Sequence, residues 1–374
     1  MVDQFPAVLV TGARQAGKTS ILRHLYPQIS YLSLDLPANA EAANTAPEQL
    51  LNQFPEPVII DEIQYAPSLL RHLKARIDEN RSPGRYLLTG SQVFPLMQGV
   101  SESLAGRCAI LNLHTLARAE LLDAGHLGEE TTHIFLGGYP ELHLRAETDL
   151  WFPAYVATYL ERDVRNILRV IDLQEFNRFI RACALRTSQV INYSDLARDT
   201  GIAPNTARKW AGLLQTSAII SLVEPYFGNR TKRLIKSPKL FFLDTGLAAF
   251  LSGFRSQENL FASSLAGAFW ETHVFGQIIK HAASRGNSSP VNFWRTANGP
   301  EVDLVMEQAG GTVIAIECKF KERPDNSDAA GLRALADAEK GRIRKRVIVC
   351  RTKVTYKLSD ETLIVNPLEL LNNI

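Results

Sequence analysis

The sequence contains little cysteine, no long apolar run and almost no net charge. Its four cysteines lie far apart and form no CxxC pair, so we expect reduced thiols, no disulfide framework and no cysteine-based zinc site. No apolar run approaches the roughly 18 residues that a membrane span needs, and the N-terminus lacks a signal-peptide pattern. These absences predict a cytoplasmic protein with no membrane partner.

The bulk composition is typical of a globular protein, with 45% hydrophobic and 21% charged residues. A chain of 374 residues exceeds the usual size of one hydrophobic core, so two or three domains are expected. The net charge of +2 favours no class of partner. The distribution of charge along the chain is therefore more informative than its sum.

The stretch 8–20, VLVTGARQAGKTS, has the spacing of a phosphate-binding loop (Walker A). An apolar run leads into it, and a predicted helix follows. In such a loop, backbone N–H groups and a helix N-terminus meet the phosphates, while a lysine adds a mobile positive charge. A glycine-rich turn without a ligand is the alternative. The residues predicted to bind ATP are Gly12, Ala13, Arg14, Gln15, Ala16, Gly17, Lys18, Thr19 and Ser20, with the Thr19 hydroxyl on Mg²⁺.

A second apolar run, 57–60, leads directly into Asp61 and Glu62. A buried strand that ends in two carboxylates fits a nucleotide hydrolase with a phosphate-binding loop. Asp61 would hold Mg²⁺ through water, and Glu62 would polarise the attacking water. The pattern (Walker B) is weak alone, because many strands end in Asp.

A third strand is expected over 85–92, where polar residues follow the apolar run. Among them, Ser91 could lie between the second carboxylate and the γ-phosphate. Simple turn chemistry around Gly90 explains the same residues.

Residues 8–113 resemble the AAA-type P-loop ATPases. The whole chain is similar to a prokaryotic family that joins such an ATPase to a C-terminal domain of unknown function. The resemblance implies an ATP- and Mg²⁺-dependent hydrolase that assembles as a homo-oligomer, a ring or spiral such as a hexamer. The matching phrases are TGARQAGKTS, IIDEIQ, LLTGSQ, SLAGR, GGYPE, YLERDV, KLFFLDTGL, EVDLV and IECK.

The resemblance also implies a role for Arg107, which follows a predicted helix over 94–104 and precedes a predicted strand over 108–113. In AAA-type ring ATPases, an arginine at this place reaches into the site of the neighbouring subunit. There it offsets charge on the transferred phosphoryl group. A plain surface arginine is the alternative.

The middle of the chain predicts a winged helix-turn-helix, with helices over 176–187, 193–200 and 204–216 and a hairpin over 219–235. Between 204 and 240, Glu224 is the only acid, which is typical of a surface that binds phosphates. A structural winged helix that packs between domains is the alternative. The basic residues of this stretch are Arg208, Lys209, Arg230, Lys232, Arg233, Lys236 and Lys239; of these, Arg208, Lys209, Arg230, Lys232 and Arg233 are predicted to contact DNA.

The C-terminal part predicts a helix over 261–284, strands over 291–295, 301–306 and 312–319, a helix over 329–340 and a strand over 346–350. This order resembles the PD-(D/E)xK nuclease fold. Glu317 and Lys319 share one face of a strand. With Glu271 and Asp303, Glu317 could bind a second divalent cation, while Lys319 orients the attacking water. A module that binds DNA or supports assembly without cutting is the alternative.

The predicted fold class is α/β, with an AAA-type ATPase domain (1–125), a helical connector (126–172), a winged helix-turn-helix (173–245) and a nuclease-like domain (246–374). The leading prediction for function is an ATP-hydrolysing protein that acts on DNA. The alternative is a regulatory ATPase whose nucleotide state controls assembly and whose C-terminal domain is inactive.

Overall fold

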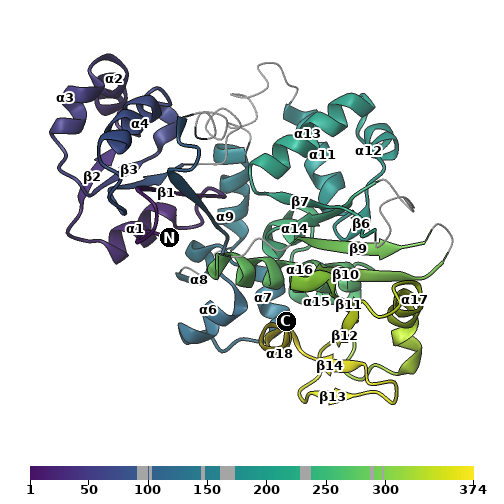
Figure 1. Ribbon diagram of the computed structural model, residues 1–374. Helices are drawn as coiled ribbons and strands as arrows, with labels where there is room; N and C mark the ends of the chain where they lie inside the picture. Colours follow the sequence, from purple (N-terminus) through teal and green to yellow (C-terminus); the bar gives the residue numbers. More distant parts are fainter. Residues whose placement is uncertain are drawn as a thin grey trace. The chain divides into compact units, whose positions relative to one another are not determined.

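The computed structural model describes residues 1–90, 100, 103–144, 148–160, 173–227, 237–286, 290–296 and 299–374. It contains two compact units, shown in Figure 1. Among the described helices, none combines the length and the apolar character that a bilayer span requires. The first unit comprises Met1–Thr115 and Thr216–Ala218, and the second comprises Leu116–Gln215 and Ile219–Ile374.

The first unit is built on a five-stranded parallel sheet with the strand order β2-β3-β4-β1-β5. Because every strand runs the same way, the carboxyl ends of β1, β3 and β4 meet at one edge. The strands are β1 (Ala7–Gly12), β2 (Ser30–Ser33), β3 (Val58–Asp61), β4 (Tyr86–Thr89) and β5 (Cys108–Leu113); the helices are α1 (Lys18–Leu25), α2 (Pro37–Thr45), α3 (Pro47–Asn52), the 3₁₀ turn η1 (Ile63–Tyr65) and α4 (Leu69–Glu79).

Both faces of this sheet are covered, as expected for parallel strands that are apolar throughout. One face packs Leu9, Ile60 and Leu88 against α2, α3 and α4. On the other face, Val8 and Ile59 belong to a cluster with Leu22 of α1 and the neighbouring strands. The predicted α/β fold with a parallel sheet is therefore confirmed for this unit.

The helices of the second unit come mainly before its large sheet. Two of them, α12 and α13, have the predicted bounds and are joined by Gly201, whose φ of 77° is the left-handed conformation of a helix C-cap. The helices are α6 (Arg118–Asp123), α7 (Glu130–Leu136), α8 (Pro140–Leu144), α9 (Thr148–Tyr155), the π-helical turn η2 (Val156–Leu160), α11 (Leu173–Ala184), α12 (Tyr193–Thr200), α13 (Pro204–Thr216), α14 (Thr245–Leu251), α15 (Gln257–Ala262), α16 (Ala266–Ser284), α17 (Ala330–Ala338) and α18 (Pro367–Asn373), with 3₁₀ turns η3 (Ala309–Gly311) and η4 (Asn326–Ala329).

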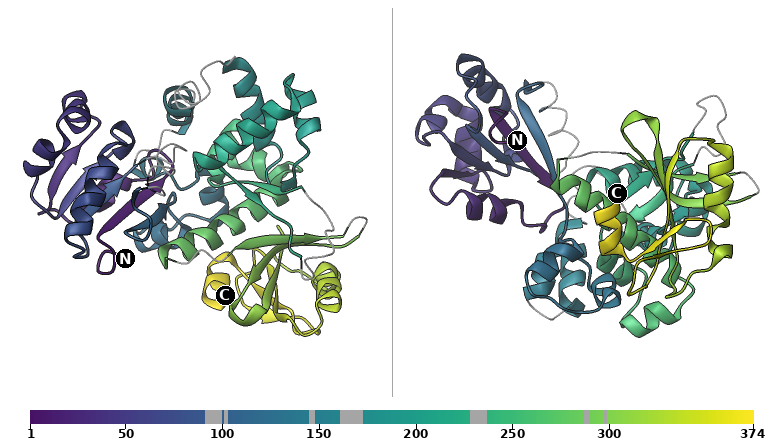
Figure 2. Two further views of the ribbon diagram at one scale, coloured as in Figure 1. Left: turned by 45° about the horizontal axis from the view of Figure 1, so that its top comes forward. Right: turned by 60° about the horizontal axis from the view of Figure 1, so that its bottom comes forward.

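Two sheets complete this unit, with strand orders β6-β8-β7 and β13-β14-β12-β11-β10-β9. A bridge between Pro225 and Phe293 connects the end of β7 to β9. Residues of α16 pack on one face of the larger sheet and those of α17 on the other (Figure 2). The strands are β6 (Gln189–Val190), β7 (Ile220–Val223), β8 (Lys239–Phe242), β9 (Val291–Arg295), β10 (Glu301–Glu307), β11 (Val313–Cys318), β12 (Ile343–Val349), β13 (Tyr356–Lys357) and β14 (Leu363–Val365).

The single helix predicted over 261–284 is wrong, because the chain forms α15 and α16 with a break between them. Ser263 causes the break. Its hydroxyl donates to the carbonyl of Leu260 at 2.7 Å and accepts from the backbone N–H of Leu265 at 3.1 Å. A serine side chain that bonds nearby backbone groups in this way competes with the helix.

Two of the sequence phrases that support the family resemblance, GGYPE and KLFFLDTGL, meet in a tight joint. Asp244 caps α14 and accepts a hydrogen bond from the backbone N–H of Gly138 at 2.8 Å. A Cβ on Gly137 would lie 2.2 Å from the Asp244 carboxylate, and one on Gly246 would lie 2.2 Å from the Leu136 carbonyl. Only glycine fits at these two positions.

One continuous cluster of buried residues links the helix-turn-helix region to the larger sheet. It contains Trp210 of α13, Phe241 of β8, Trp270 of α16 and Ile316 of β11. The predicted boundaries at 125, 172 and 245 are not tested by this packing and stay predictions.

Candidate nucleotide-binding site

The loop after β1 has the backbone geometry that a phosphate-binding turn requires. Gly12 (φ 145°) and Gly17 (φ 94°) both adopt conformations that favour glycine, and a Cβ on Gly12 would lie 2.0 Å from the Leu113 carbonyl oxygen. The Lys18 side chain, 6% exposed, folds back over the loop. Its ammonium donates to the carbonyls of Gly12 at 3.3 Å and Ala13 at 2.9 Å. The loop therefore holds its lysine in a defined place.

Asp61, at the end of β3, is the centre of a hydrogen-bond network. Its Oδ1 accepts from the hydroxyl of Thr19 at 2.7 Å and from that of Thr89. Its Oδ2 accepts from the hydroxyl of Tyr31 at 2.8 Å. The structure thus brings Thr19 and Asp61, two of the predicted metal-site residues, into direct contact. Hydroxyl and carboxylate oxygens are the ligands that Mg²⁺ prefers, so these residues fit that ion.

The sequence gives no signal for Tyr31, which lies on β2. In the parallel pairing of β2 with β3, Ser33 lies opposite Asp61, so Tyr31, two residues earlier, points to the same face as Ser33. Burial and the Asp61 carboxylate raise the pKa of Tyr31 to about 12, so its hydroxyl keeps its proton and donates. The Arg23 guanidinium lies over the Tyr31 ring, 5.0 Å from its centroid.

Replacing Tyr31 by phenylalanine is expected to free one oxygen of Asp61 without removing its charge. We expect the Mg²⁺ concentration for half-maximal ATP turnover to change by about 3- to 10-fold, while turnover at saturating Mg²⁺ changes less, since one hydrogen bond is worth about 1 kcal/mol. Phosphate release measured across a Mg²⁺ series checks this. An identical Mg²⁺ dependence in both proteins would show that Tyr31 does not position Asp61.

Glu62 adopts the left-handed conformation, with φ at 58°, which is uncommon for a residue with a Cβ. Its backbone N–H donates to the Thr89 hydroxyl at 3.0 Å, so the residue that contacts Asp61 also fixes Glu62. The Gln64 amide donates to the Glu62 carboxylate. Thr89 is fully buried, and its hydroxyl links the Asp61 carboxylate to the backbone of Glu62 at the end of the sheet.

Arg107 lies at the opposite edge of the sheet from this network. Its carbonyl accepts from the backbone N–H of Ala7, at the start of β1, whereas the loop follows the end of β1. The strand alone separates the two ends by roughly 16 Å. The guanidinium forms a two-point ion pair with Asp78, at 2.7 and 3.0 Å. Arg107 is therefore placed away from the phosphate-binding loop of its own chain.

Several predicted site residues lie outside the described residues, so the structure gives no position for them. They are Ser91, near the end of the third strand, and Arg230, Lys232 and Arg233, on the predicted wing.

Arg208 and Lys209 are exposed on α13, the second helix of the predicted helix-turn-helix. The Arg208 guanidinium lies over the ring of Tyr193, 5.1 Å from its centroid. Lys239, by contrast, is 2% exposed. Counting Lys239 among the basic surface residues was therefore wrong, because it lies on a strand that is buried on both faces.

Lys239 instead lies among the carboxylates predicted for the nuclease-like site. Its ammonium is 2.6 Å from Glu271, 2.7 Å from Glu301 and 3.6 Å from Asp303. Burial alone would lower the pKa of Lys239, but these carboxylates raise it. Glu317 pairs with Lys319 at 2.7 Å.

The second cation predicted for this carboxylate cluster stays a prediction. Among the described residues, the one group of three His, Cys, Asp or Glu side chains that gathers its ligand atoms closely enough for a metal lies elsewhere in the unit. The Lys239 ammonium supplies the positive charge here. Lys239 and Lys319 pair with Glu271, Asp303 and Glu317 in this arrangement.

Burial and the nearby Asp303 carboxylate raise the pKa of both Glu271 and Glu317 to about 8. The folded state therefore binds more protons on these two carboxyls than the unfolded state does between about pH 4.5 and 8. Since the folded state binds more protons in this range, the free energy of unfolding falls as the pH rises.

We expect the wild type to lose on the order of 2 kcal/mol of stability between pH 5 and 8, relative to a Glu271→Gln variant that cannot titrate there. Urea unfolding at several pH values measures this. Glu307→Gln, an exposed change on the strand that carries Asp303, is the control and should keep the wild-type slope. Equal slopes in wild type and Glu271→Gln would contradict the raised pKa.

Three family models match successive parts of the chain. An AAA domain matches residues 4–122, and two domains of unknown function, DUF8612 and DUF4143, match residues 129–258 and 266–371. Two curated proteins are 30% identical over 363 residues, which is 96% of this chain and 80% of theirs. They are the uncharacterized proteins Rv2008c of Mycobacterium tuberculosis and Mb2031c of Mycobacterium bovis.

Two solved structures share weaker likeness. A variant of Thermotoga maritima RuvB is 16% identical, with 58% of this chain and 82% of that chain covered and a TM-score of 0.29. A signal transduction ATPase (STAND) protein with a tetratricopeptide repeat sensor from Pyrococcus horikoshii is 12% identical, with 75% and 45% covered and a TM-score of 0.26. These scores are too low for either likeness to carry an argument.

Proposed function

Because this chain belongs to a family of prokaryotic AAA-type P-loop ATPases with a C-terminal domain of unknown function, we propose that it binds and hydrolyses ATP and acts on DNA. One observation carries the ATP part of the proposal. The Thr19 hydroxyl and the Asp61 carboxylate, 42 residues apart in sequence, are hydrogen-bonded beside a buried lysine at the carboxyl edge of a parallel sheet.

Each residue at this edge has a separate task. The Lys18 ammonium and the N–H groups of the loop bind the phosphates, and Thr19 and Asp61 hold Mg²⁺, which neutralises phosphate charge when bound. Glu62 accepts a hydrogen bond from the attacking water and orients it towards the γ-phosphate. Thr89 bonds both the Asp61 carboxylate and the Glu62 backbone and so fixes their positions, which makes it a positioning residue.

Arg107 completes the site of a neighbouring subunit in this proposal. Its position at the far edge of the sheet supports action on another chain rather than on its own loop. To reach a neighbour's nucleotide, the guanidinium must leave Asp78. A homo-oligomeric ring or spiral, such as a hexamer, gives every subunit one such neighbour.

DNA contact is proposed for the helix-turn-helix region. The support is the exposed pair Arg208 and Lys209 on α13, together with the basic sequence of the predicted wing. Two adjacent cations on the second helix of such a motif can reach the phosphates of a duplex.

A regulatory ATPase with an inactive C-terminal domain is the second candidate. The Lys239 ammonium lies among Glu271, Glu301 and Asp303. It supplies the positive charge that a divalent cation would bring in a nuclease, and this favours a C-terminal domain that does not cut DNA. Cleavage of DNA with Lys319 and a second divalent cation stays a prediction. The two candidates differ in whether nucleic acid changes ATP turnover.

The test compares ATP turnover and DNA binding with duplex, forked and single-stranded DNA across a salt series. We expect DNA to stimulate the wild type, and Arg208→Glu with Lys209→Glu to abolish stimulation and reduce the slope of log affinity against log salt by about 2. The control carries the same charge change on the exposed Arg178 and Arg181 of α11. A wild type that neither binds DNA nor responds to it would favour the regulatory ATPase.

A further inference from the structure

A second cluster of chemically active side chains lies in the second unit, apart from the carboxylates discussed above. The ligand atoms of Glu130, His133 and His273 all lie within 4.8 Å of one another. Glu130 and His133 are three residues apart on α7, so they share a helix face. His273 comes from α16, where it is 2% exposed.

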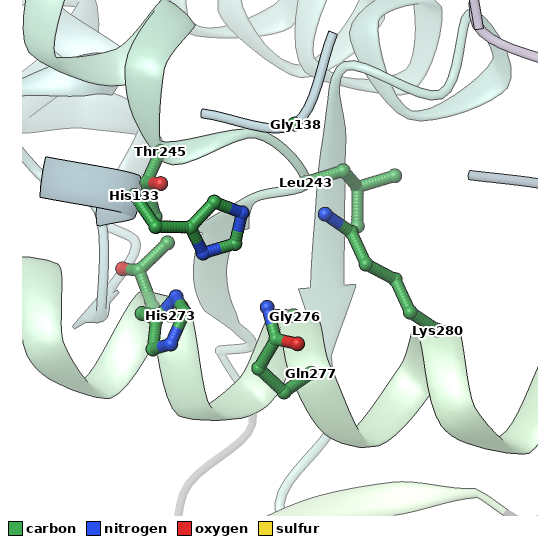
Figure 3. A pocket seen from close by; sticks show the side chains of 9 residues that line it. His133, Gly138, Leu243, Thr245, His273, Gly276, Gln277 and Lys280 are labelled. Atoms are coloured by element: carbon green, nitrogen blue, oxygen red, sulfur yellow. The ribbon is translucent and has the colours of Figure 1, made fainter. Parts of the chain in front are cut away.

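His133 is the unusual member of this cluster. It is 4% exposed, and within the described residues neither of its ring nitrogens has a hydrogen-bond partner. Buried polar groups are nearly always paired, because an unpaired one costs folding free energy. Figure 3 shows the His133 and His273 rings beside a small pocket that Gln277 and Lys280 also line. The ring centroids are 5.3 Å apart.

The charges around the cluster are well defined. One oxygen of Glu130 pairs with His273 Nε2, and the other lies 3.5 Å from Arg118 Nε. The Lys280 ammonium donates to the Leu116 carbonyl at 3.0 Å. Burial, with the nearby cationic groups, lowers the pKa of His133. The two cations oppose a bound metal ion, whereas the Glu130 carboxylate favours it.

We propose that Glu130, His133 and His273 bind one Zn²⁺ ion that links α7 to α16. Two imidazole nitrogens and one carboxylate oxygen are zinc ligands, whereas Mg²⁺ and Ca²⁺ prefer oxygen alone. Tetrahedral ligands of zinc lie about 3.3 Å apart. The most widely separated of these atoms therefore need to approach one another by at most about 1.5 Å, and the paired Glu130 oxygen and His273 nitrogen need to move apart. These three side chains belong neither to the proposed ATPase site nor to the predicted DNA contacts.

The pocket beside the cluster leaves room for a fourth ligand of the ion. Its volume of about 10 Å³ accommodates one water molecule, which can fill the fourth coordination position. Zinc therefore acts as a cross-link between α7 and α16, whose ligands Glu130 and His273 lie 143 positions apart in the sequence.

The experiment measures metal binding to the untagged full chain in excess Mg²⁺. After treatment with EDTA and removal of the chelator, the protein is titrated with Zn²⁺ against a chromophoric competitor, and bound metal is counted by mass spectrometry. We expect one Zn²⁺ per wild-type chain and at least about 100-fold weaker binding in His133→Gln and in His273→Gln. We also expect Zn²⁺ to raise the thermal midpoint of the wild type by roughly 5 °C.

The matched control is His281→Gln, which changes a partly exposed histidine on the same helix α16. It should bind zinc as the wild type does. Failure of the wild type to bind Zn²⁺ at micromolar free ion, or equal binding by His133→Gln, would overturn the proposal. If the variants do not fold, the spectrum of Co²⁺-loaded wild type decides. Tetrahedral bands without a thiolate charge-transfer band support the site, whereas a thiolate band assigns the ion to cysteine and overturns it.

Discussion

The Lys18→Ala protein is expected to bind ATP at least about 100-fold more weakly than the wild type and to show no measurable turnover, since a positioned charge on a transferred phosphoryl group contributes about 100- to 1,000-fold. The reason is local. Lys18 is the one residue of the loop whose ammonium can follow the phosphates, and its present bonds to Gly12 and Ala13 keep it over the loop. Titration with a fluorescent ATP analogue and a phosphate-release assay measure the two effects.

Loss of folding must be separated from loss of binding in this variant. Lys18 also bonds two loop carbonyls, so its removal is expected to lower stability by about 1–2 kcal/mol. Thermal unfolding without nucleotide reports that change. Lys74→Ala, an exposed lysine on α4, is the matched control and should behave as wild type. Unchanged ATP affinity in a folded Lys18→Ala protein would remove the proposed nucleotide site.

The Glu62→Gln protein is expected to keep its ATP affinity while its turnover falls by about 100- to 10,000-fold, the range that general-base catalysis contributes. Glutamine keeps the shape of the side chain but cannot accept the proton of the attacking water as a carboxylate does. The backbone bond from Glu62 to Thr89 is unaffected, so the left-handed conformation should persist. Glu41→Gln, an exposed change on α2, is the control. Wild-type turnover in Glu62→Gln would exclude Glu62 as the base.

The same variant tests whether Arg107 acts between subunits. Glu62→Gln and Arg107→Ala proteins, each inactive alone, are expected to recover roughly a quarter of wild-type turnover when mixed as equal parts, because that share of interfaces pairs an intact Glu62 with an intact Arg107. Arg107→Ala also loses the ion pair with Asp78, so its stability is measured in parallel. No recovery in a mixture that assembles would place Arg107 outside the neighbour's site.

The places of the nucleotide-site residues could be predicted from sequence because each lies at or just after the end of an apolar strand. Parallel pairing then brings the strand ends together without further information. The hydrogen bonds from Tyr31 and Thr89 to Asp61 could not be predicted in this way. They depend on the strand order β2-β3-β4-β1-β5 and on the register of β2 with β3. Neither can be read from the residues of one strand alone.

Lys239 shows the limit of charge counting along the chain. It follows a run of basic residues and was grouped with them, yet the β-strand that it begins is buried at every position. The apolar residues after it, Leu240 to Phe242, were the available signal that the strand is central. Its partners Glu271 and Glu301 come from segments that only the fold brings near.

The cluster of Glu130, His133 and His273 was also missed, although Glu130 and His133 have the spacing of two ligands on one helix face. That spacing is common by chance. What distinguishes this pair is the burial of His133 and the approach of His273 from a helix far along the chain, and both are properties of the tertiary structure.

The continuous buried cluster in the second unit restricts how the chain can be divided in the laboratory. A fragment that ends near residue 245 would separate Trp210 and Phe241 from Trp270 and Ile316, and it would expose apolar surface on both pieces. The bridge between Pro225 and Phe293 would be cut as well. Truncation at that position is therefore expected to give aggregating halves, and the helix-turn-helix cannot be transplanted as an independent module.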